Sequence, residues 1–223
     1  MSLLFQGPYI DYLRSLPPLV SAEYFGHGSS TMLFSDQGRL YRLTRQGCGH
    51  NFVSRQSASG NPHVTRVIQD FGPVAPSDED KEDYYWLAQV EWLQDLDPAN
   101  AVTQKLITLL VELTDDEPQI YGEDLQQFAY RCLELSNEEP ELRGLLTTLA
   151  TMAAFASEHE AEADIKLDNI MLRPGTNELV LADPICDTYF VIDSAQREQM
   201  EQVRDYVLGE MASRAEAATS SDI

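Results

Sequence analysis

The hydrophobic periodicity changes once along this chain, and that change limits the fold more than any other feature. Up to a connector near Val90 to Leu93, apolar and aromatic residues fall in short runs that are typical of strands. From about residue 98 they recur at a spacing of three to four, which is typical of helices. The order predicts an α+β protein with a β-rich N-terminal lobe over 9–90 and a short helical C-terminal lobe over 91–212.

The N-terminal lobe contains several strand-like runs. The segment TMLFSDQGRLYRLTR (31–45) predicts two strands around a DQG turn. Two further runs of β-branched and aromatic residues, at 63–74 and 84–93, are joined by the acidic loop SDEDKED. The segment 49–57 has a weaker helical pattern. These runs account for most of the lobe.

Four helices are predicted in the rest of the chain. The second covers 122–135, and Ser136 with Glu139 forms a capping box that places the start of the third helix at Ser136. The fourth begins at Asp193 or Ser194. The first helix carries one apolar face, formed by Val102, Leu106, Leu109, Leu110 and Leu113.

Residues at the two ends are treated separately. The segment LLFQGP, Leu3 to Pro8, closely resembles the end of a viral cysteine-protease cleavage site that expression vectors carry, so residues 1–8 are read as a vector remnant. No affinity tag separates Met1 from this segment, which leaves a native origin open. The last residues, 213–223, are expected to form a flexible tail.

Composition indicates a folded and acidic protein. Hydrophobic residues make up 43% of the 223 residues, no apolar run approaches the roughly 18 needed to cross a bilayer, and no signal peptide is evident. Three widely spaced cysteines predict reduced thiols and a cytoplasmic protein. A net charge of -22 argues against direct binding of nucleic acid or of an anionic membrane. It suits a soluble protein or one with a basic protein partner.

The segment EADIKLDNIMLRPGTNELVLADPICD, 162–187, places two carboxylates, an amide and a lysine around one short hairpin. Phosphoryl transfer needs hard oxygen ligands for Mg²⁺, a carboxylate near the attacking hydroxyl and a cation beside the transferred group. The apolar runs IML and LVLA would be two short strands that hold the loop rigid. Asp164, Lys166, Asn169 and Asp183 lie in an order that fits these needs.

Two fragments of this hairpin, DIKLDNIML and LADP, resemble the catalytic loop and the magnesium-binding strand end of protein kinases. The resemblance implies that Asp164 positions the substrate hydroxyl and accepts its proton, and that Lys166 neutralises the γ-phosphoryl group. It also implies that Asn169 and Asp183 bind Mg²⁺. The lysine in DIK favours serine or threonine targets over tyrosine.

The resemblance extends to the nucleotide site. YFGHGSST (24–31) resembles a shortened glycine-rich loop, whose backbone amides would approach the phosphates of ATP. Arg42 in LYRL stands where the family has a lysine, and its guanidinium is bulkier and differs in charge geometry. Glu91 lies in the connector and is also expected to contact the nucleotide. The loop residues expected to do so are Gly26, Gly28, Ser29 and Ser30.

Several departures from the kinase pattern narrow the resemblance. The segment GHNFVSRQSASG lacks the glutamate that pairs with the cation in the family, Glu162 and Ala163 replace the usual His-Arg, and Pro184 follows Asp183. Only 40 residues follow Asp183 in the 223-residue chain. These features resemble the early serine/threonine kinases of T-odd podophages (autographiviruses), with minimal bacterial effector kinases as the sister group.

The function implied by the resemblance is phosphorylation of host proteins, in the host cytoplasm, with a change in host transcription or defence. ATP and Mg²⁺ are the expected cofactors, and the sequence does not indicate an oligomeric state. Two alternatives remain open. A pseudokinase could inhibit a host protein by binding, for which a basic nucleic-acid enzyme suits the charge. A small-molecule phosphotransferase could use an acidic cleft for cationic substrates.

Overall fold

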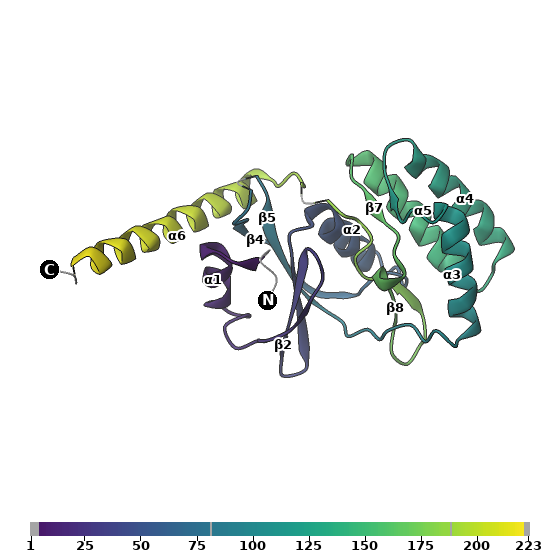
Figure 1. Cartoon of the computed structure of the whole chain (residues 1–223), viewed down its shortest axis with the longest axis horizontal. Coiled ribbons are helices and arrows are strands. Elements are labelled where there is room, and N and C mark those ends of the chain that lie inside the picture. Colours follow the sequence, from purple (N-terminus) through teal and green to yellow (C-terminus); the bar gives the residue numbers. More distant parts are fainter. Residues whose placement is uncertain (1–4, 81, 188, 221–223) are drawn as a thin grey trace. The chain divides into compact units, whose positions relative to one another are not determined.

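The computed structural model describes residues 5–80, 82–187 and 189–220 and confirms the α+β class (Figure 1). The elements in chain order are α1 (Pro8–Arg14), β1 (Glu23–His27), β2 (Thr31–Asp36), β3 (Arg39–Thr44), α2 (Gly47–Ala58), β4 (Val67–Pro76), β5 (Tyr84–Val90), α3 (Ala101–Thr114), β6 (Gln119–Ile120), α4 (Asp124–Glu138), α5 (Arg143–Glu158), β7 (Ala163–Asp164), a 3-10 turn (Leu167–Asn169), β8 (Ile170–Leu172), β9 (Leu179–Leu181) and α6 (Ser194–Ser220).

The chain divides into two compact units whose boundaries differ from the predicted lobes of 9–90 and 91–212. α2 belongs with the helices because the Phe52 ring packs 5.5 Å from the Phe155 ring of α5. α6 belongs with the sheet. The first unit comprises the described residues of Met1–Gly47, Asp70–Gln89 and Thr188–Ile223, and the second comprises Cys48–Gln69 and Val90–Asp187.

The first unit is built on a five-stranded sheet in the order β1-β2-β3-β5-β4. The predicted hairpin around DQG is confirmed: β2 and β3 pair antiparallel, and Gln37 and Gly38 connect them, with φ values of 47° and 81°. Positive φ at both positions of a two-residue loop matches the right-handed twist of the strands. The core on this sheet includes Phe34, Leu43 and Tyr85, all fully buried.

Phe5, which belongs to the segment that the sequence assigned to a vector remnant, is part of this core. Phe5 is 3% exposed, and its ring lies 6.3 Å from that of Tyr85. The Asp78 carboxylate accepts hydrogen bonds from the backbone N–H groups of Tyr9 and Ile10 at 3.0 and 3.1 Å, which satisfies two donors at the start of α1. Whatever their origin, the described residues of this segment contribute to the fold, while residues 1–4 lie outside the described part.

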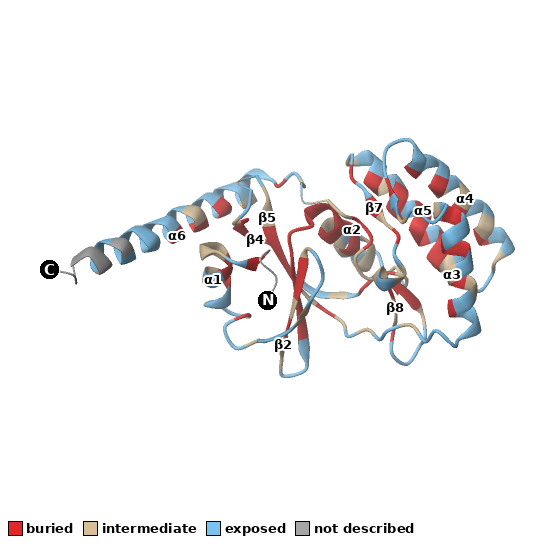
Figure 2. Ribbon diagram, in the orientation of Figure 1, coloured by how far each residue is buried: buried red, intermediate tan, exposed pale blue. Residues whose placement is uncertain are grey.

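α6 continues the first unit beyond the expected end of the helix at 212. Met200, Val203 and Val207 bury its inner side, whereas the rest of the helix is largely exposed (Figure 2). Tyr206 packs on Tyr12 of α1 with ring centroids 5.5 Å apart. The expected flexible tail over 213–223 is therefore helical as far as Ser220, and 221–223 lie outside the described residues.

The second unit contains the helices α2 to α5 and two small β-structures. α4 lies beside α5, and their facing sides are buried (Figures 1 and 2). β6 pairs with β7, and β8 pairs with β9, in each case antiparallel. The core includes Leu106, Leu125, Phe128, Leu142, Leu145, Leu146, Leu149 and Met152.

The predicted capping box is wrong. Ser136 lies in the last turn of α4, where its hydroxyl donates to the Leu133 carbonyl at 2.7 Å, and α5 begins only at Arg143. Glu139 precedes Pro140, and a residue before proline is disfavoured in helical conformation. Glu139 has φ -119° and ψ 78°, so the helix ends there. The serine-to-glutamate spacing thus belongs to a helix C-terminus, and Glu139 forms an ion pair with Lys105.

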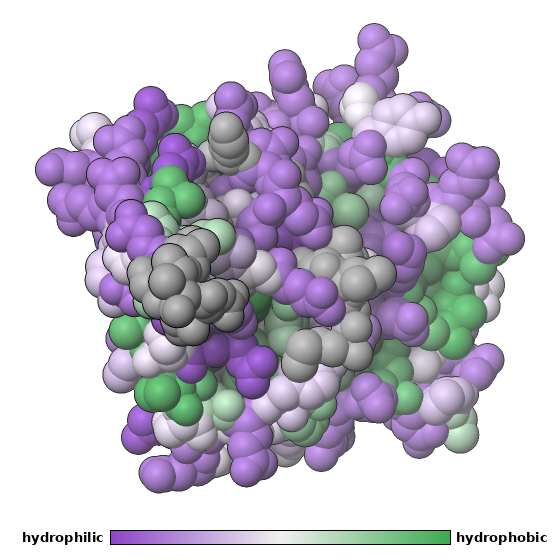
Figure 3. Space-filling model, turned by 60° about the vertical axis from the view of Figure 1, so that its left-hand side comes forward, coloured by the Kyte–Doolittle hydropathy of each residue, from purple (hydrophilic) through white to green (hydrophobic). Residues whose placement is uncertain are grey.

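The surface is strongly hydrophilic, as the net charge requires. Figure 3 shows a face on which hydrophilic residues predominate and apolar residues form separate patches. Among the described residues, no helix is both long and apolar enough to cross a membrane.

Replacing Gly7 by alanine tests whether residues 5–8 are part of the folded core. A Cβ at Gly7 would lie 2.4 Å from Cγ of Asp78, and the φ of 142° disfavours any side chain. We expect Gly7→Ala to lower the free energy of unfolding by about 2 kcal/mol, measured by urea denaturation. Gly209→Ala is the matched control, because its Cβ would meet nothing within 4 Å in α6, and it should raise stability by about 0.5 kcal/mol. Equal effects of the two would contradict the packing of Gly7 on Asp78.

Candidate functional site

The predicted catalytic hairpin is present in the second unit, and its register brings three of the predicted residues to one end. β8 and β9 pair with Ile170 opposite Leu181. One step further along the ladder, the Ala182 N–H donates to the Asn169 carbonyl at 2.8 Å. On the other side of Asp183, the Pro184 carbonyl accepts from the Asp164 N–H at 2.9 Å. Asp183 is thus held between the backbones of Asn169 and Asp164.

The side chains of Asp164, Lys166 and Asn169 are in direct contact. Lys166 Nζ lies 2.9 Å from Asp164 Oδ1, and Asn169 Nδ2 donates to Asp164 Oδ2 at 3.1 Å and to the Asp164 carbonyl at 3.0 Å. The hydrogen bond to Asp164 raises the pKa of Lys166, so the amine is charged at neutral pH. Since the amide nitrogen of Asn169 faces Asp164, its Oδ1 is the atom that could bind a cation.

Gly49 of α2 approaches the Asp183 segment closely, and the sequence analysis missed its role. A Cβ at this position would lie 2.8 Å from the Ile185 carbonyl oxygen and 3.7 Å from Asp183 Oδ1. Only glycine allows α2 to approach so closely. The signal in the sequence is GCGH at 47–50, where two glycines lie at the start of the helix.

The pKa of the Cys186 thiol reflects the negative charge around this end of the hairpin. Burial raises its pKa first, and the carboxylates of Asp164, Glu162 and Asp183 raise it further, against the opposing charge of Lys166. The thiol is therefore protonated at neutral pH and is not a nucleophile. Cys48 and Cys132 are also buried, and burial raises the pKa of each to about 12.

The donor set fits Mg²⁺ bound together with phosphate oxygens. Among the described residues, no group of three or more histidine, cysteine, aspartate or glutamate side chains could hold a metal alone. The carboxylate of Asp183 and the amide oxygen of Asn169 are hard donors. A magnesium ion bound with a nucleotide commonly takes only one or two protein ligands of this kind, the rest being phosphate oxygens and water.

The predicted glycine loop belongs to the first unit and forms the turn between β1 and β2. The Gly28 N–H donates to the Thr31 carbonyl at 2.9 Å. A Cβ at Gly26 or Gly28 would meet nothing within 4 Å. Ser29 is exposed, and the Ser30 carbonyl accepts from the Arg45 N–H at 3.0 Å. The turn is open, and the role predicted for these four residues in binding a nucleotide stays a prediction.

Arg42 is buried in β3 of the first unit, with 5% of its surface exposed, and lies opposite Leu33 in the β2–β3 register. Its predicted contact with nucleotide phosphates also stays a prediction. Arg42 and the glycine turn are in the first unit, whereas Asp164, Lys166, Asn169 and Asp183 are in the second.

Glu91 forms a network of hydrogen bonds with Arg173 and Arg66, and its predicted contact with the nucleotide stays a prediction. Its Oε2 accepts from Arg173 Nε at 2.9 Å, and its Oε1 accepts from Arg173 Nη2 at 2.7 Å and from the Arg66 N–H at 2.6 Å. Its own N–H donates to the Arg66 carbonyl at 3.0 Å. Burial alone would raise the pKa of Glu91, but the hydrogen bonds from Arg173 and Arg66 outweigh it and lower the pKa.

Arg173 anchors the catalytic hairpin and was also missed from the sequence. It is 7% exposed and follows β8. Besides Glu91, it binds the Pro62 carbonyl at 2.5 Å, the Val64 carbonyl at 3.0 Å and the Glu178 carboxylate at 2.6 Å. In the sequence it is one charged residue beside a Pro-Gly turn, a setting typical of exposed residues.

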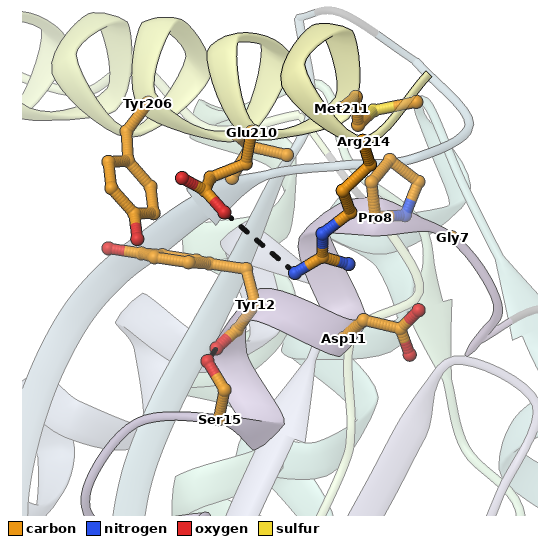
Figure 4. Close-up of a pocket in the computed structure, with 10 residues that line it drawn as sticks. Gly7, Pro8, Asp11, Tyr12, Ser15, Tyr206, Glu210, Met211 and Arg214 are labelled. Carbon is orange, nitrogen blue, oxygen red and sulfur yellow. Dashed lines mark hydrogen bonds and ion pairs between the residues drawn. The ribbon is translucent and has the colours of Figure 1, made fainter. Parts of the chain in front are cut away.

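A larger hollow in the first unit contains none of the predicted residues. It has a volume of about 630 Å³ and lies between α1 and α6 in the first unit (Figure 4). Tyr12 and Tyr206 line it, and Glu210 pairs with Arg214 at 3.9 Å across its rim. The candidate site is therefore identified by the functional groups of the hairpin and not by the volume of a hollow.

Comparison with known proteins adds little. No known protein family and no curated protein matches the sequence. One solved structure that matches is of a protein described as an aminoglycoside phosphotransferase of Ralstonia eutropha JMP134, with 16% sequence identity and a TM-score of 0.30. The match covers 75% of this chain and 60% of that one, so this chain spans less than two thirds of its length. A likeness of this size shows neither fold nor function.

Replacing Arg173 by methionine should strongly destabilise the second unit. The change leaves the partly buried carboxylate of Glu91 without its charged partner, and we expect a cost of about 3 kcal/mol, the lower end of the range for breaking a buried ion pair. Arg214→Met is the matched control, because its side chain is 81% exposed and 3.9 Å from its partner, so stability should change by less than about 0.5 kcal/mol. Urea denaturation and hydrogen exchange of β8 and β9 measure the effect. Similar losses in both variants would refute the anchoring role.

The ion pair between Glu91 and Arg173 predicts that the stability of the protein depends on pH. Because the pKa of Glu91 is lower in the folded state than its ordinary value of 4.5, its contribution is complete above that value and is lost as the pH falls through the folded pKa. We expect the urea midpoint of the wild type to fall on acidification below about pH 4.5, and the fall to be smaller in Arg173→Met. A steeper fall in the variant would contradict this linkage.

Proposed function

We propose that this protein is an ATP-dependent serine/threonine protein kinase whose catalytic end is the 162–187 hairpin. The observation that carries the proposal is the contact among Asp164, Lys166 and Asn169, with Asp183 held between the backbones of two of them. A carboxylate, an ammonium group and a pair of hard oxygen donors on one rigid hairpin are the groups that phosphoryl transfer requires.

Each residue has a role in the proposed reaction. Asp164 orients the serine or threonine hydroxyl and accepts its proton as the oxygen attacks the γ-phosphorus, while the bond from the γ-phosphorus to the oxygen of ADP breaks and ADP leaves. Lys166 exchanges its contact with Asp164 for one with the γ-phosphoryl oxygens, and it offsets the negative charge that they carry. Asn169 and Asp183 would hold Mg²⁺, which would neutralise negative charge on the phosphates.

The nucleotide contacts proposed for residues of the first unit rest on the sequence resemblance. We assign Gly26, Gly28, Ser29 and Ser30 to the phosphates, and Arg42 to the α- and β-phosphates. The exposure of the turn supports this assignment. Glu91 stays in the proposed nucleotide site, in addition to the hydrogen bonds that its carboxylate accepts from Arg173 and from the Arg66 N–H.

The proposed substrates are host proteins, and the proposed setting is infection by a phage, where their phosphorylation would alter host transcription or defence. The resemblance of the hairpin and its Asp-Pro end to the early kinases of T-odd podophages supports this role. The net charge of -22 supports a basic protein substrate, such as an enzyme that acts on nucleic acid.

A binding protein without catalytic activity is the second candidate, and one observation favours it. α2 contains no acidic residue in GCGHNFVSRQSA, so it cannot supply the carboxylate that kinases pair with the phosphate-binding cation. In this alternative the acidic protein inhibits a host protein by occupying its basic surface.

Labelled ATP separates the two candidates. We expect the wild type with Mg²⁺ to label proteins in a bacterial lysate, and Asp164→Asn and Asp183→Asn to reduce the rate by roughly 10²–10⁴-fold. Asp95→Asn is the matched control, because Asp95 is exposed and lies outside the hairpin. Thermal unfolding of each variant verifies that it is folded.

Three outcomes would contradict the proposed kinase. Equal labelling by Asp164→Asn and the wild type would remove Asp164 from the reaction. Absence of labelling, with no Mg²⁺-dependent stabilisation by nucleotide, would support the binding protein. Label on small cationic compounds but on no protein would support a small-molecule phosphotransferase.

A further inference from the structure

A groove beside the catalytic hairpin lies entirely within the second unit. It has a volume of about 300 Å³ and is formed by the C-terminal half of α3, the loop to β6 and the loop that follows β7. Small ligand sites in proteins begin at about this size. The residues lining it are Ile107, Leu110, Val111, Thr114, Asp116, Pro118, Ile165, Lys166, Leu167 and Asp168.

The groove is rigidly connected to Asp164. Gln119 pairs with Asp164 in the β6–β7 ladder, and the Ile165 N–H donates to the Pro118 carbonyl at 2.7 Å. Lys166 forms part of the groove wall, and its Nζ is 2.9 Å from Asp164 Oδ1. A molecule in the groove therefore lies directly beside the groups proposed to carry the reaction.

The walls of the groove combine apolar surface with negative charge. Val111 is 48% exposed and, with Ile107 and Leu167, offers apolar surface to a ligand. The charged residues of the lining are Asp116, Asp168 and Lys166, and the ammonium of Lys166 is already paired with Asp164. The groove thus suits a ligand that carries both an apolar group and a cationic group.

A second hollow extends the surface along the same loop. It has a volume of about 230 Å³, shares Thr114 with the groove, and is lined by the carboxylates of Asp115, Glu117 and Asp124 as well as by Tyr121. The basic residue in it, Arg131, donates to the carbonyls of α3 at Leu113 and Glu112. Two acidic hollows in series along one loop suit an extended chain better than a compact small molecule.

We propose that this groove binds the polypeptide acceptor, and that it selects a segment in which a lysine or arginine lies next to an apolar residue, close to the serine or threonine that is phosphorylated. The inference rests on the proposed kinase activity and names its substrate class. The apolar side chain packs on Val111 and Leu167, and the cation lies between Asp116 and Asp168. Lys166 remains available for the phosphoryl group.

Synthetic peptides provide the test. The probes are short peptides that contain one serine and an arginine next to a leucine. The arginine is placed in turn at each position that flanks the serine. Each peptide has a parent in which glutamine replaces the arginine. For the best arginine peptide, we expect Asp116→Asn to raise KM roughly threefold, the effect of losing one exposed charge pair. Val111→Ser should raise it roughly fivefold, because it removes apolar contact without adding charge. Neither change should alter kcat or ATP hydrolysis without a peptide.

Glu112→Gln is the matched control, since it removes one negative charge from α3 outside the groove lining. It should leave KM unchanged for both peptides. The decisive quantity is the ratio of kcat/KM between the arginine and glutamine peptides, because a general loss of stability does not change this ratio. Asp116→Asn should lower the ratio, and Glu112→Gln should not.

The outcomes distinguish this inference from the proposed function. If peptides are phosphorylated but no arginine position is preferred, or if Asp116→Asn leaves the ratio unchanged, the groove proposal fails and the kinase stands. If no peptide is phosphorylated, binding of a fluorescent arginine peptide is measured by anisotropy. Binding that Asp116→Asn and Val111→Ser weaken would then support the groove while the kinase fails, and an absence of binding would overturn the groove as well.

Discussion

The candidate site depends on the ion pairs and hydrogen bonds of the buried Arg173 guanidinium. A buried charge is costly unless it is paired and hydrogen-bonded, and Arg173 satisfies this condition through two carboxylates and two backbone carbonyls. These partners come from the connector, from the segment before β4 and from the hairpin itself. One side chain therefore fixes the end of β8 to two segments that are distant in sequence.

With that end fixed, the hairpin has little freedom. β9 is bound along one edge by the segment around Val64, since the Leu181 N–H donates to the His63 carbonyl at 2.9 Å and the Leu181 carbonyl accepts from the Thr65 N–H at 3.0 Å. β8 is bound along the other edge by Gln94, at 2.8 and 2.9 Å. The position of Asn169 relative to Asp183 then follows from the register of two three-residue strands. Such support by rigid elements is what a site for phosphoryl transfer needs, because its catalysis depends on position and charge.

Local sequence predicted the parts of this structure that depend on local rules. The DQG turn, the helix over 101–114 and the apolar strands of the hairpin follow from turn chemistry and periodicity. The proximity of Asp164, Asn169 and Asp183 could be predicted from the sequence, because the strands between Asn169 and Asp183 are short. Arg173 and Gly49 were not predicted, since their importance comes largely from residues far away in the sequence: Glu91 and Pro62 lie 82 and 111 positions from Arg173, and Gly49 approaches Ile185. The capping box failed because proline at 140 ends a helix where the serine-to-glutamate spacing suggests a beginning.

The protonation of the three thiols has a consequence for how the protein withstands oxidation. Peroxides and alkylating reagents attack the thiolate, and burial keeps Cys48, Cys132 and Cys186 in the thiol form at neutral pH, with nearby carboxylates adding to this effect at Cys48 and Cys186. At Cys186 the carboxylates of Asp164, Glu162 and Asp183 therefore also disfavour the form of the sulfur atom that such reagents attack.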